Sequence, residues 1–196
     1  MPEASQNNWQ RVAEATHNVV TPANAITTAS AAMVFDGIRQ MDRPIGLAKI
    51  AAGRALDILD GKVARATGTA SELGEMFDAT ADKLQIGALL LKGAEKGIIP
   101  KPAALYIGAQ NFSNALLSIQ ARRTGRTIHP NKSGKHTMFA QCTAIVGYIA
   151  ASQLENAGLN RAAKVTSLVA HTALSASVIL GVKATHAYAK DAGIIS

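Results

Sequence analysis

Cysteine and aromatic residues are scarce in this sequence of 196 residues. The single cysteine, Cys142, excludes a disulfide within the chain and a metal site built from several cysteines. Only 4% of the residues are aromatic although 48% are hydrophobic, so small side chains such as alanine supply much of the apolar mass. The beginning of the chain lacks a charged stretch followed by an apolar one, and we therefore expect neither a cleavable signal peptide nor secretion.

Acidic residues are also in short supply. Lysine and arginine outnumber aspartate and glutamate by 20 to 13, which favours an anionic partner such as a phosphorylated small molecule, a lipid headgroup or a nucleic acid. The sequence has no basic stripe rich in aromatics, so we do not expect nucleic acid as a partner. It also lacks a glycine-rich phosphate loop and a Ser-His-Asp order, and its five histidines have no metal-ligand spacing.

The alternation of apolar and polar residues that predicts strands is missing as well. A short amphipathic segment is followed by six helical segments of similar length, joined by short loops, which predicts an all-α bundle. The length of the chain suits one domain, residues 1–196. The expected helices are 5–17, 19–38, 44–61, 74–99, 102–121, 136–152 and 165–188.

The six longer segments are close to the roughly 20 residues that cross about 30 Å of hydrocarbon. Their many small residues are typical of tightly packed membrane helices, although a soluble alanine-rich bundle is an alternative at a mean hydropathy of only +0.12. Basic residues are modestly enriched in the loops after the second and fourth of these segments, which should then face the cytoplasm. We therefore expect a multi-pass protein of the cell membrane.

Four aspartates contrast with this acid-poor background. Asp57 and Asp60 lie three residues apart, and Asp78 and Asp82 four apart, so each pair shares one face of a helix. The stretch between the pairs can end one helix, turn at Gly68 and begin an antiparallel helix, which would bring the pairs together. Four converging carboxylates would bind hard divalent cations such as Mg²⁺, Mn²⁺ or Ca²⁺, whereas separate pairs would be solvated helix faces.

Small residues and one arginine complete the pattern around the acids. Gly61, Ala64 and Gly74 leave room near the backbone, and Arg65 adds a cation suited to phosphate. The pattern reads D-x2-D-G-x2-A-R-x8-G-x3-D-x3-D over residues 57–82. It resembles the signature of the CDP-alcohol phosphotransferases, integral membrane enzymes that make phospholipids, and matches it without a departure.

The resemblance implies six transmembrane helices after an N-terminal amphipathic helix, a homodimer, and CDP-diacylglycerol as the lipid donor. It implies two divalent ions, Mg²⁺ or Mn²⁺, at a site that faces the cytoplasm, with Asp82 as the general base. The residues that it assigns are Asp57, Asp60, Asp78 and Asp82 as metal ligands, and Gly61, Ala64, Arg65 and Gly74 as the lining of the CDP site.

The alcohol acceptor is less sharply indicated. "DATADKL" and "GKHTMFAQ" resemble stretches of phosphatidylglycerophosphate synthases, and "TPANAIT" is similar to the entry to the first span in the family, which favours glycerol 3-phosphate. In the basic loop between the fourth and fifth spans, Arg122, Arg126 and Lys135 are candidate ligands of its phosphate. The same loop could instead contact anionic lipid. Inositol phosphate, serine or another alcohol are alternative acceptors.

Two other classes of protein remain open at this point. A non-catalytic membrane protein could keep a metal site for structure or lipid binding, although such a site would not need a base at Asp82. A soluble helical enzyme acting on prenyl diphosphates would also use aspartates and Mg²⁺, but that class places two adjacent aspartates in each motif. This sequence contains no Asp-Asp pair.

Overall fold

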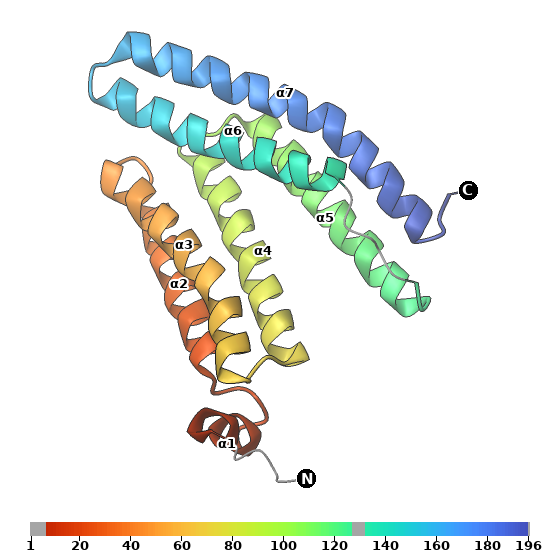
Figure 1. The fold of residues 1–196 in the computed structure, drawn as a ribbon. Helices are drawn as coiled ribbons and strands as arrows, with labels where there is room; N and C mark the ends of the chain where they lie inside the picture. Colours follow the sequence, from red (N-terminus) through yellow and green to blue (C-terminus); the bar gives the residue numbers. More distant parts are fainter. Residues whose placement is uncertain (1–6, 127–131, 196) are drawn as a thin grey trace. The chain divides into compact units, whose positions relative to one another are not determined.

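The structure is a computed structural model that describes residues 7–126 and 132–195. Over these residues the chain forms seven helices and no strand, which confirms the predicted all-α class (Figure 1). The helices are α1 (Asn8–Ala15), α2 (Pro22–Arg39), α3 (Pro44–Thr67), α4 (Glu72–Glu95), α5 (Lys101–Arg123), α6 (Lys132–Asn156) and α7 (Asn160–Asp191). The chain divides into two compact units, Met1–Leu89 and Leu90–Ser196, with the boundary inside α4, and the units are described separately below.

In the first unit, α2 and α3 form an antiparallel hairpin (Figure 1). Each helix begins with proline, at Pro22 and Pro44. Proline suits this position because an N–H there would have no partner within the helix, so its absence costs nothing. Glycine lets the two backbones approach: a Cβ added to Gly37 would lie 2.7 Å from the Gly46 carbonyl oxygen and 2.9 Å from the Ile50 nitrogen. The Ser30 hydroxyl also donates a hydrogen bond to the Gly53 carbonyl oxygen, at 2.9 Å.

A tight turn after α3 reverses the chain into α4, as the sequence predicts. Gly68 ends α3 with φ 67°, in the left-handed region that glycine adopts most easily. The Asn7 side chain donates to the Thr67 carbonyl oxygen at 2.9 Å, which fixes the beginning of α1 to the end of α3. The Ser71 hydroxyl then accepts from the Gly74 N–H at 3.1 Å and caps the start of α4.

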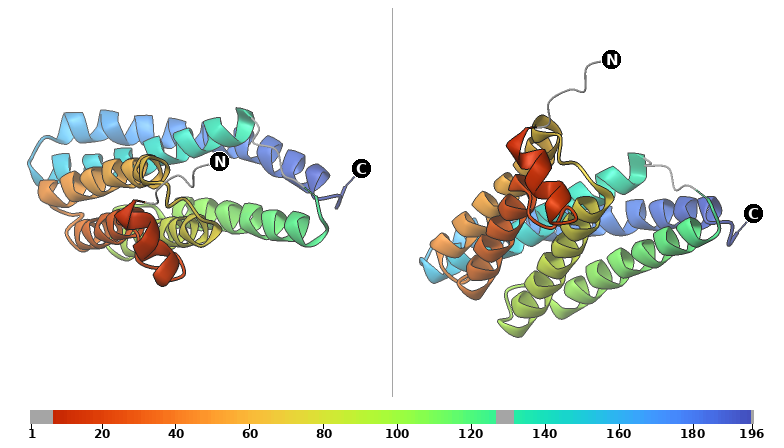
Figure 2. Two further views of the ribbon diagram at one scale, coloured as in Figure 1. Left: turned by 60° about the horizontal axis from the view of Figure 1, so that its bottom comes forward. Right: turned by 90° about the horizontal axis from the view of Figure 1, so that it is seen from below.

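In the second unit, α6 and α7 form a long antiparallel hairpin, which Figures 1 and 2 both show. Side-chain hydrogen bonds join α5 to this hairpin. Gln110 accepts from Gln141 at 2.6 Å, Asn114 accepts from Thr185 at 3.0 Å, and the Tyr106 hydroxyl donates to the Ser177 carbonyl at 2.7 Å. Gln141, the last residue of "GKHTMFAQ", therefore takes part in helix packing.

One helix among the described residues, α7, is long and apolar enough to cross a membrane. Many large apolar side chains nevertheless face outward on other helices, including Leu105 on α5 and Phe139 on α6, which are 74% and 75% exposed. Six spans and a cytoplasmic site remain predictions.

Candidate active site

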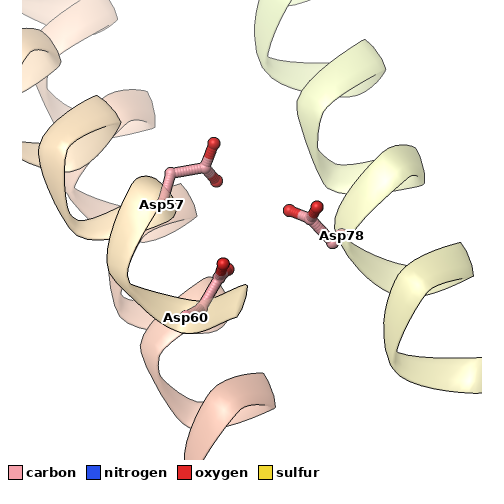
Figure 3. A group of neighbouring side chains, drawn as sticks. All are labelled: Asp57, Asp60 and Asp78. Carbon is pink, nitrogen blue, oxygen red and sulfur yellow. The ribbon is translucent and has the colours of Figure 1, made fainter. Parts of the chain in front are cut away.

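Three of the four aspartates meet within the first unit. Asp57 and Asp60 project from α3 toward Asp78 on α4 (Figure 3). Each contributes a carboxylate oxygen that lies within 4.8 Å of the oxygens from the other two. The turn at Gly68 makes this possible, because it places the two helices of the sequence pattern face to face.

Asp60 is the most firmly held of the three. It is only 4% exposed, and both of its carboxylate oxygens accept hydrogen bonds. The Thr27 hydroxyl on α2 lies 2.6 Å from Oδ2, and the Gly61 N–H donates to Oδ1 at 2.6 Å. These contacts fix the orientation of a buried carboxylate whose charge would otherwise be poorly solvated.

Asp57 and Asp78 each keep a buried oxygen without a hydrogen-bond partner. The atoms are Oδ1 in both residues. Buried polar atoms are nearly always paired in proteins, so two such oxygens beside a third carboxylate suit a cation. An all-oxygen donor set is the kind that Mg²⁺, Mn²⁺ and Ca²⁺ prefer, and the three aspartates fit such an ion.

The structure does not gather Asp82 into this group. Its Oδ1 lies 2.5 Å from Nη1 of Arg54, which is also 3.2 Å from Oδ2 of Asp57. One guanidinium nitrogen thus bridges a carboxylate of α3 and a carboxylate of α4. The side chain of Asp82 is 29% exposed, against 13% for Asp57.

A cleft of about 320 Å³ opens beside the aspartates, within the first unit. It contains all four of the small and basic residues singled out by the signature, together with Asp60 and Asp78. Its lining is Ala23, Asn24, Thr27, Asp60, Gly61, Ala64, Arg65, Thr69, Ala70, Ser71, Gly74, Glu75 and Asp78.

The cleft combines features that suit a phosphate-bearing ligand. The start of α4 at Ser71 and Gly74 contributes the positive end of a helix dipole, and Arg65 contributes a guanidinium. The absence of side chains at Gly61 and Gly74 leaves the backbone accessible. Divalent cations at the aspartates would offset the negative charge of the lining, which includes Glu75 as well as Asp60 and Asp78, and would allow a diphosphate to bind.

Sequence reasoning did not assign Thr27 and Asn24 to the site. Both belong to "TPANAIT" and line the cleft from α2. The Asn24 amide donates to the carbonyl oxygens of Asn18 and Val19, at 3.0 Å each, and so fixes the chain before α2. The resemblance of this stretch to the family's entry to the first span was the signal that could have found them.

The candidate acceptor residues lie in the second unit. Arg126 and Lys135 are exposed, and the guanidinium of Arg126 lies against the backbone at Gly193. The backbone of Arg122 is within α5, but its side chain and residues 127–131 of the basic loop are outside the part of the chain that the structure describes. Whether these cations form a phosphate pocket remains a prediction.

Comparison with known proteins adds a family match. The sequence model described as CDP-alcohol phosphatidyltransferase matches residues 16–182, which include the aspartates, the cleft and most of both units. No individual curated protein and no solved structure matches the chain.

Proposed function

Because the chain belongs to the CDP-alcohol phosphatidyltransferase family, we propose that it transfers a phosphatidyl group from CDP-diacylglycerol to a phosphorylated alcohol and releases CMP. Glycerol 3-phosphate is the acceptor that the sequence favours, as in phosphatidylglycerophosphate synthases. The observation that carries this proposal is the shared cleft: two carboxylates of the acid cluster, Asp60 and Asp78, line the same space as Arg65.

The donor is assigned to the cleft through its diphosphate and its cytidine. Arg65 and the start of α4 would bind phosphate oxygens, while Gly61, Ala64 and Gly74 would admit the nucleotide close to the backbone. Asp57, Asp60, Asp78 and Asp82 would hold two Mg²⁺ or Mn²⁺ ions. When bound, these ions would neutralise the diphosphate and stabilise the leaving CMP.

The reaction is a substitution at phosphorus. The acceptor hydroxyl oxygen attacks the lipid-side phosphorus, a new P–O bond forms, and the bond from that phosphorus to the bridging oxygen breaks, so that CMP leaves. Asp82 would take the proton of the attacking hydroxyl as general base. That role requires the Asp82 carboxylate to exchange its present contact with Arg54 for one with the acceptor.

Three features of this proposal extend beyond the cleft itself. Arg122, Arg126 and Lys135 would bind the phosphate of the acceptor. The six longer helices would span the cell membrane as one domain with the site on the cytoplasmic side, which the outward-facing apolar side chains of α5 and α6 support. A homodimer is proposed on the family resemblance alone.

A product assay tests the proposal directly. The purified chain in detergent is supplied with CDP-diacylglycerol, Mg²⁺ and, in parallel reactions, glycerol 3-phosphate, inositol phosphate, serine or glycerol. We expect CMP and one phospholipid product with glycerol 3-phosphate, and loss of both with EDTA until Mg²⁺ or Mn²⁺ is restored. CMP release with none of the alcohols would refute the transferase assignment, and activity in metal-free buffer would refute the role of the ions.

A further inference from the structure

Arg54 is a positively charged residue beside the acid cluster of Asp57, Asp60, Asp78 and Asp82, and it lies outside the sequence signature. It occupies α3 one turn before Asp57, and its Nη1 lies 2.5 Å from Asp82 Oδ1 and 3.2 Å from Asp57 Oδ2. The contact joins residues 28 positions apart in the sequence and links α3 to α4. Arg54 therefore holds the position between two carboxylates that a divalent ion would also need.

The remaining oxygens of the cluster are not affected in the same way. Asp57 and Asp78 each have a buried oxygen with no hydrogen-bond partner, and both oxygens of Asp60, on the same helix as Asp57, are oriented by Thr27 and Gly61. A first ion can be bound by these three carboxylates while Arg54 stays in place. An ion that uses Asp82 has to compete with the guanidinium for the same carboxylate.

We propose that Arg54 is a resident counter-cation that makes metal loading ordered: one ion binds to Asp57, Asp60 and Asp78, and a second ion binds only by displacing Arg54 from Asp82. This inference rests on the two-ion site of the proposed function. The Arg54 side chain is 36% exposed, so it has a solvent-facing path along which to leave.

The size of the effect follows from the bond that is lost. A hydrogen bond between charged groups changes an equilibrium constant by roughly tenfold or more. Because Arg54 and Asp82 are both partly exposed, their contact should lie at the low end of that range. The second ion should therefore bind about tenfold more weakly than it would without the guanidinium. The first ion should be affected less, because Asp57 is the one member of its three carboxylates that contacts Arg54, and it does so through Oδ2 and not through the unpartnered Oδ1.

The test is a titration of the full chain in detergent with Mn²⁺, in which binding is measured by calorimetry or from the electron paramagnetic resonance signal of free Mn²⁺. Arg54→Gln removes the counter-cation, and Lys49→Gln is the matched control. Lys49 is also on α3 and lies 2.5 Å from Oδ2 of Asp36, so both variants lose one positive charge and one short ion pair. Of the two variants, Arg54→Gln alone should raise the affinity for the second Mn²⁺ ion, by about tenfold. Its affinity for the first ion should stay within about threefold of the parent value.

Thermal unfolding supplies a readout that does not depend on activity. In EDTA, Arg54→Gln should unfold at a lower temperature than the parent, because Asp57 and Asp82 lose their positively charged partner. Added Mn²⁺ should raise the unfolding temperature of Arg54→Gln by more than it raises that of the parent. If Arg54→Gln fails to fold, Arg54→Lys takes its place. Its single ammonium keeps the charge without the planar fork, so its second-ion affinity should fall between those of the parent and the uncharged variant.

Several outcomes would overturn the inference. One is an affinity for the second Mn²⁺ ion that is unchanged or weaker in Arg54→Gln. Another is an equal change of that affinity in Lys49→Gln. Where Arg54→Lys is measured instead, an affinity equal to that of the parent would have the same meaning. A parent chain that binds no Mn²⁺ would instead refute the metal site of the proposed function. The two failures are thus distinguishable in one set of titrations.

Discussion

At the scale of single residues, Asp82 differs from the other three aspartates in its surroundings. It contacts Arg54 at 2.5 Å and lies outside the group in which Asp57, Asp60 and Asp78 approach one another, although Arg54 also contacts Asp57 at 3.2 Å. We predict that Asp82→Asn lowers turnover by about 10²-fold or more, since asparagine cannot accept the proton. Binding of the CDP-lipid should survive better than in Asp57→Asn, which removes a ligand of the three-aspartate group. The measurements are kcat and the donor Kd, and an equal loss of donor binding in both variants would remove the base assignment.

Thr27 is a second residue whose role can be isolated. Its hydroxyl lies 2.6 Å from Asp60 Oδ2 and 3.1 Å from the Ala23 carbonyl oxygen, whereas the neighbouring Thr28 hydroxyl donates to the Asn24 carbonyl oxygen at 2.8 Å. Partners that orient a metal ligand typically account for 10- to 100-fold in metal affinity. We predict that Thr27→Val raises the Mg²⁺ concentration for half-maximal activity roughly tenfold or more, while Thr28→Val leaves it unchanged. Equal behaviour of the two variants would show that Thr27 does not act through Asp60.

The basic loop supplies the residue-scale test of the acceptor. If Arg122, Arg126 and Lys135 bind the acceptor phosphate, replacing any one by alanine should raise the acceptor KM roughly tenfold, because a charged hydrogen bond of about 1.5–3 kcal/mol is lost. The KM of the CDP-lipid should hardly change. An unaltered acceptor KM in all three variants, together with a weaker dependence on anionic lipid, would assign the loop to the membrane surface instead.

The sequence indicated the acid cluster because its residues lie within one local stretch, where helix periodicity places Asp57 and Asp60 on one face. It predicted that all four carboxylates would converge, whereas the structure gathers Asp57, Asp60 and Asp78 and places Asp82 against Arg54. The contact of Asp82 with Arg54 joins positions 28 apart in the sequence, and the orientation of Asp60 depends on Thr27, which is 33 residues away. Such contacts depend on where α2, α3 and α4 lie in three dimensions and cannot be inferred from spacing alone.

At the scale of helices, the close approach of α2 and α3 depends on glycine. A Cβ at Gly37 would come within 2.7–2.9 Å of backbone atoms of Gly46 and Ile50, whereas one at Gly87 on α4 would meet nothing within 4 Å. We predict that Gly37→Ala lowers the free energy of unfolding by about 1–3 kcal/mol, the usual cost of overpacking. Gly87→Ala should instead be neutral or stabilise by up to about 1 kcal/mol, since alanine favours the helix.

Thermal unfolding of both variants in the same detergent tests this packing. Because α2 carries Thr27 and α3 carries Asp57 and Asp60, Gly37→Ala should also weaken Mn²⁺ binding. If Gly37→Ala is as stable as Gly87→Ala, the two helices do not pack at the distance described.

Helix existence was predictable, since seven apolar or amphipathic segments without strand alternation all became helices. Helix ends were harder to predict. The apolar segment at 44–61 continues as helix to Thr67, up to the turn predicted at Gly68, which adopts the left-handed conformation. The segment expected at 136–152 begins at Lys132, so the basic residues Lys132 and Lys135 belong to the first turn of α6 and not to a loop.

At the scale of the whole molecule, the membrane assignment carries a direct prediction. The outward-facing apolar side chains of α5, α6 and α7, such as Leu105, Phe139 and Leu168, would be costly in water. We predict that the chain remains in the membrane fraction after washing with alkaline carbonate and is released only by detergent. Release by carbonate alone would favour a soluble helical protein or one bound to the membrane surface.

The Arg54 bridge also bears on how such a molecule is made. Four aspartates that approach one another during folding would repel, and assembly of α3 against α4 would then have to wait for ions. The guanidinium of Arg54 is present as soon as the chain is synthesised, and it already joins Asp57 to Asp82. If the proposed two-ion site is correct, the helices can come together before any ion is captured, and we predict that protein made in a magnesium-poor cell is folded but inactive until ions bind.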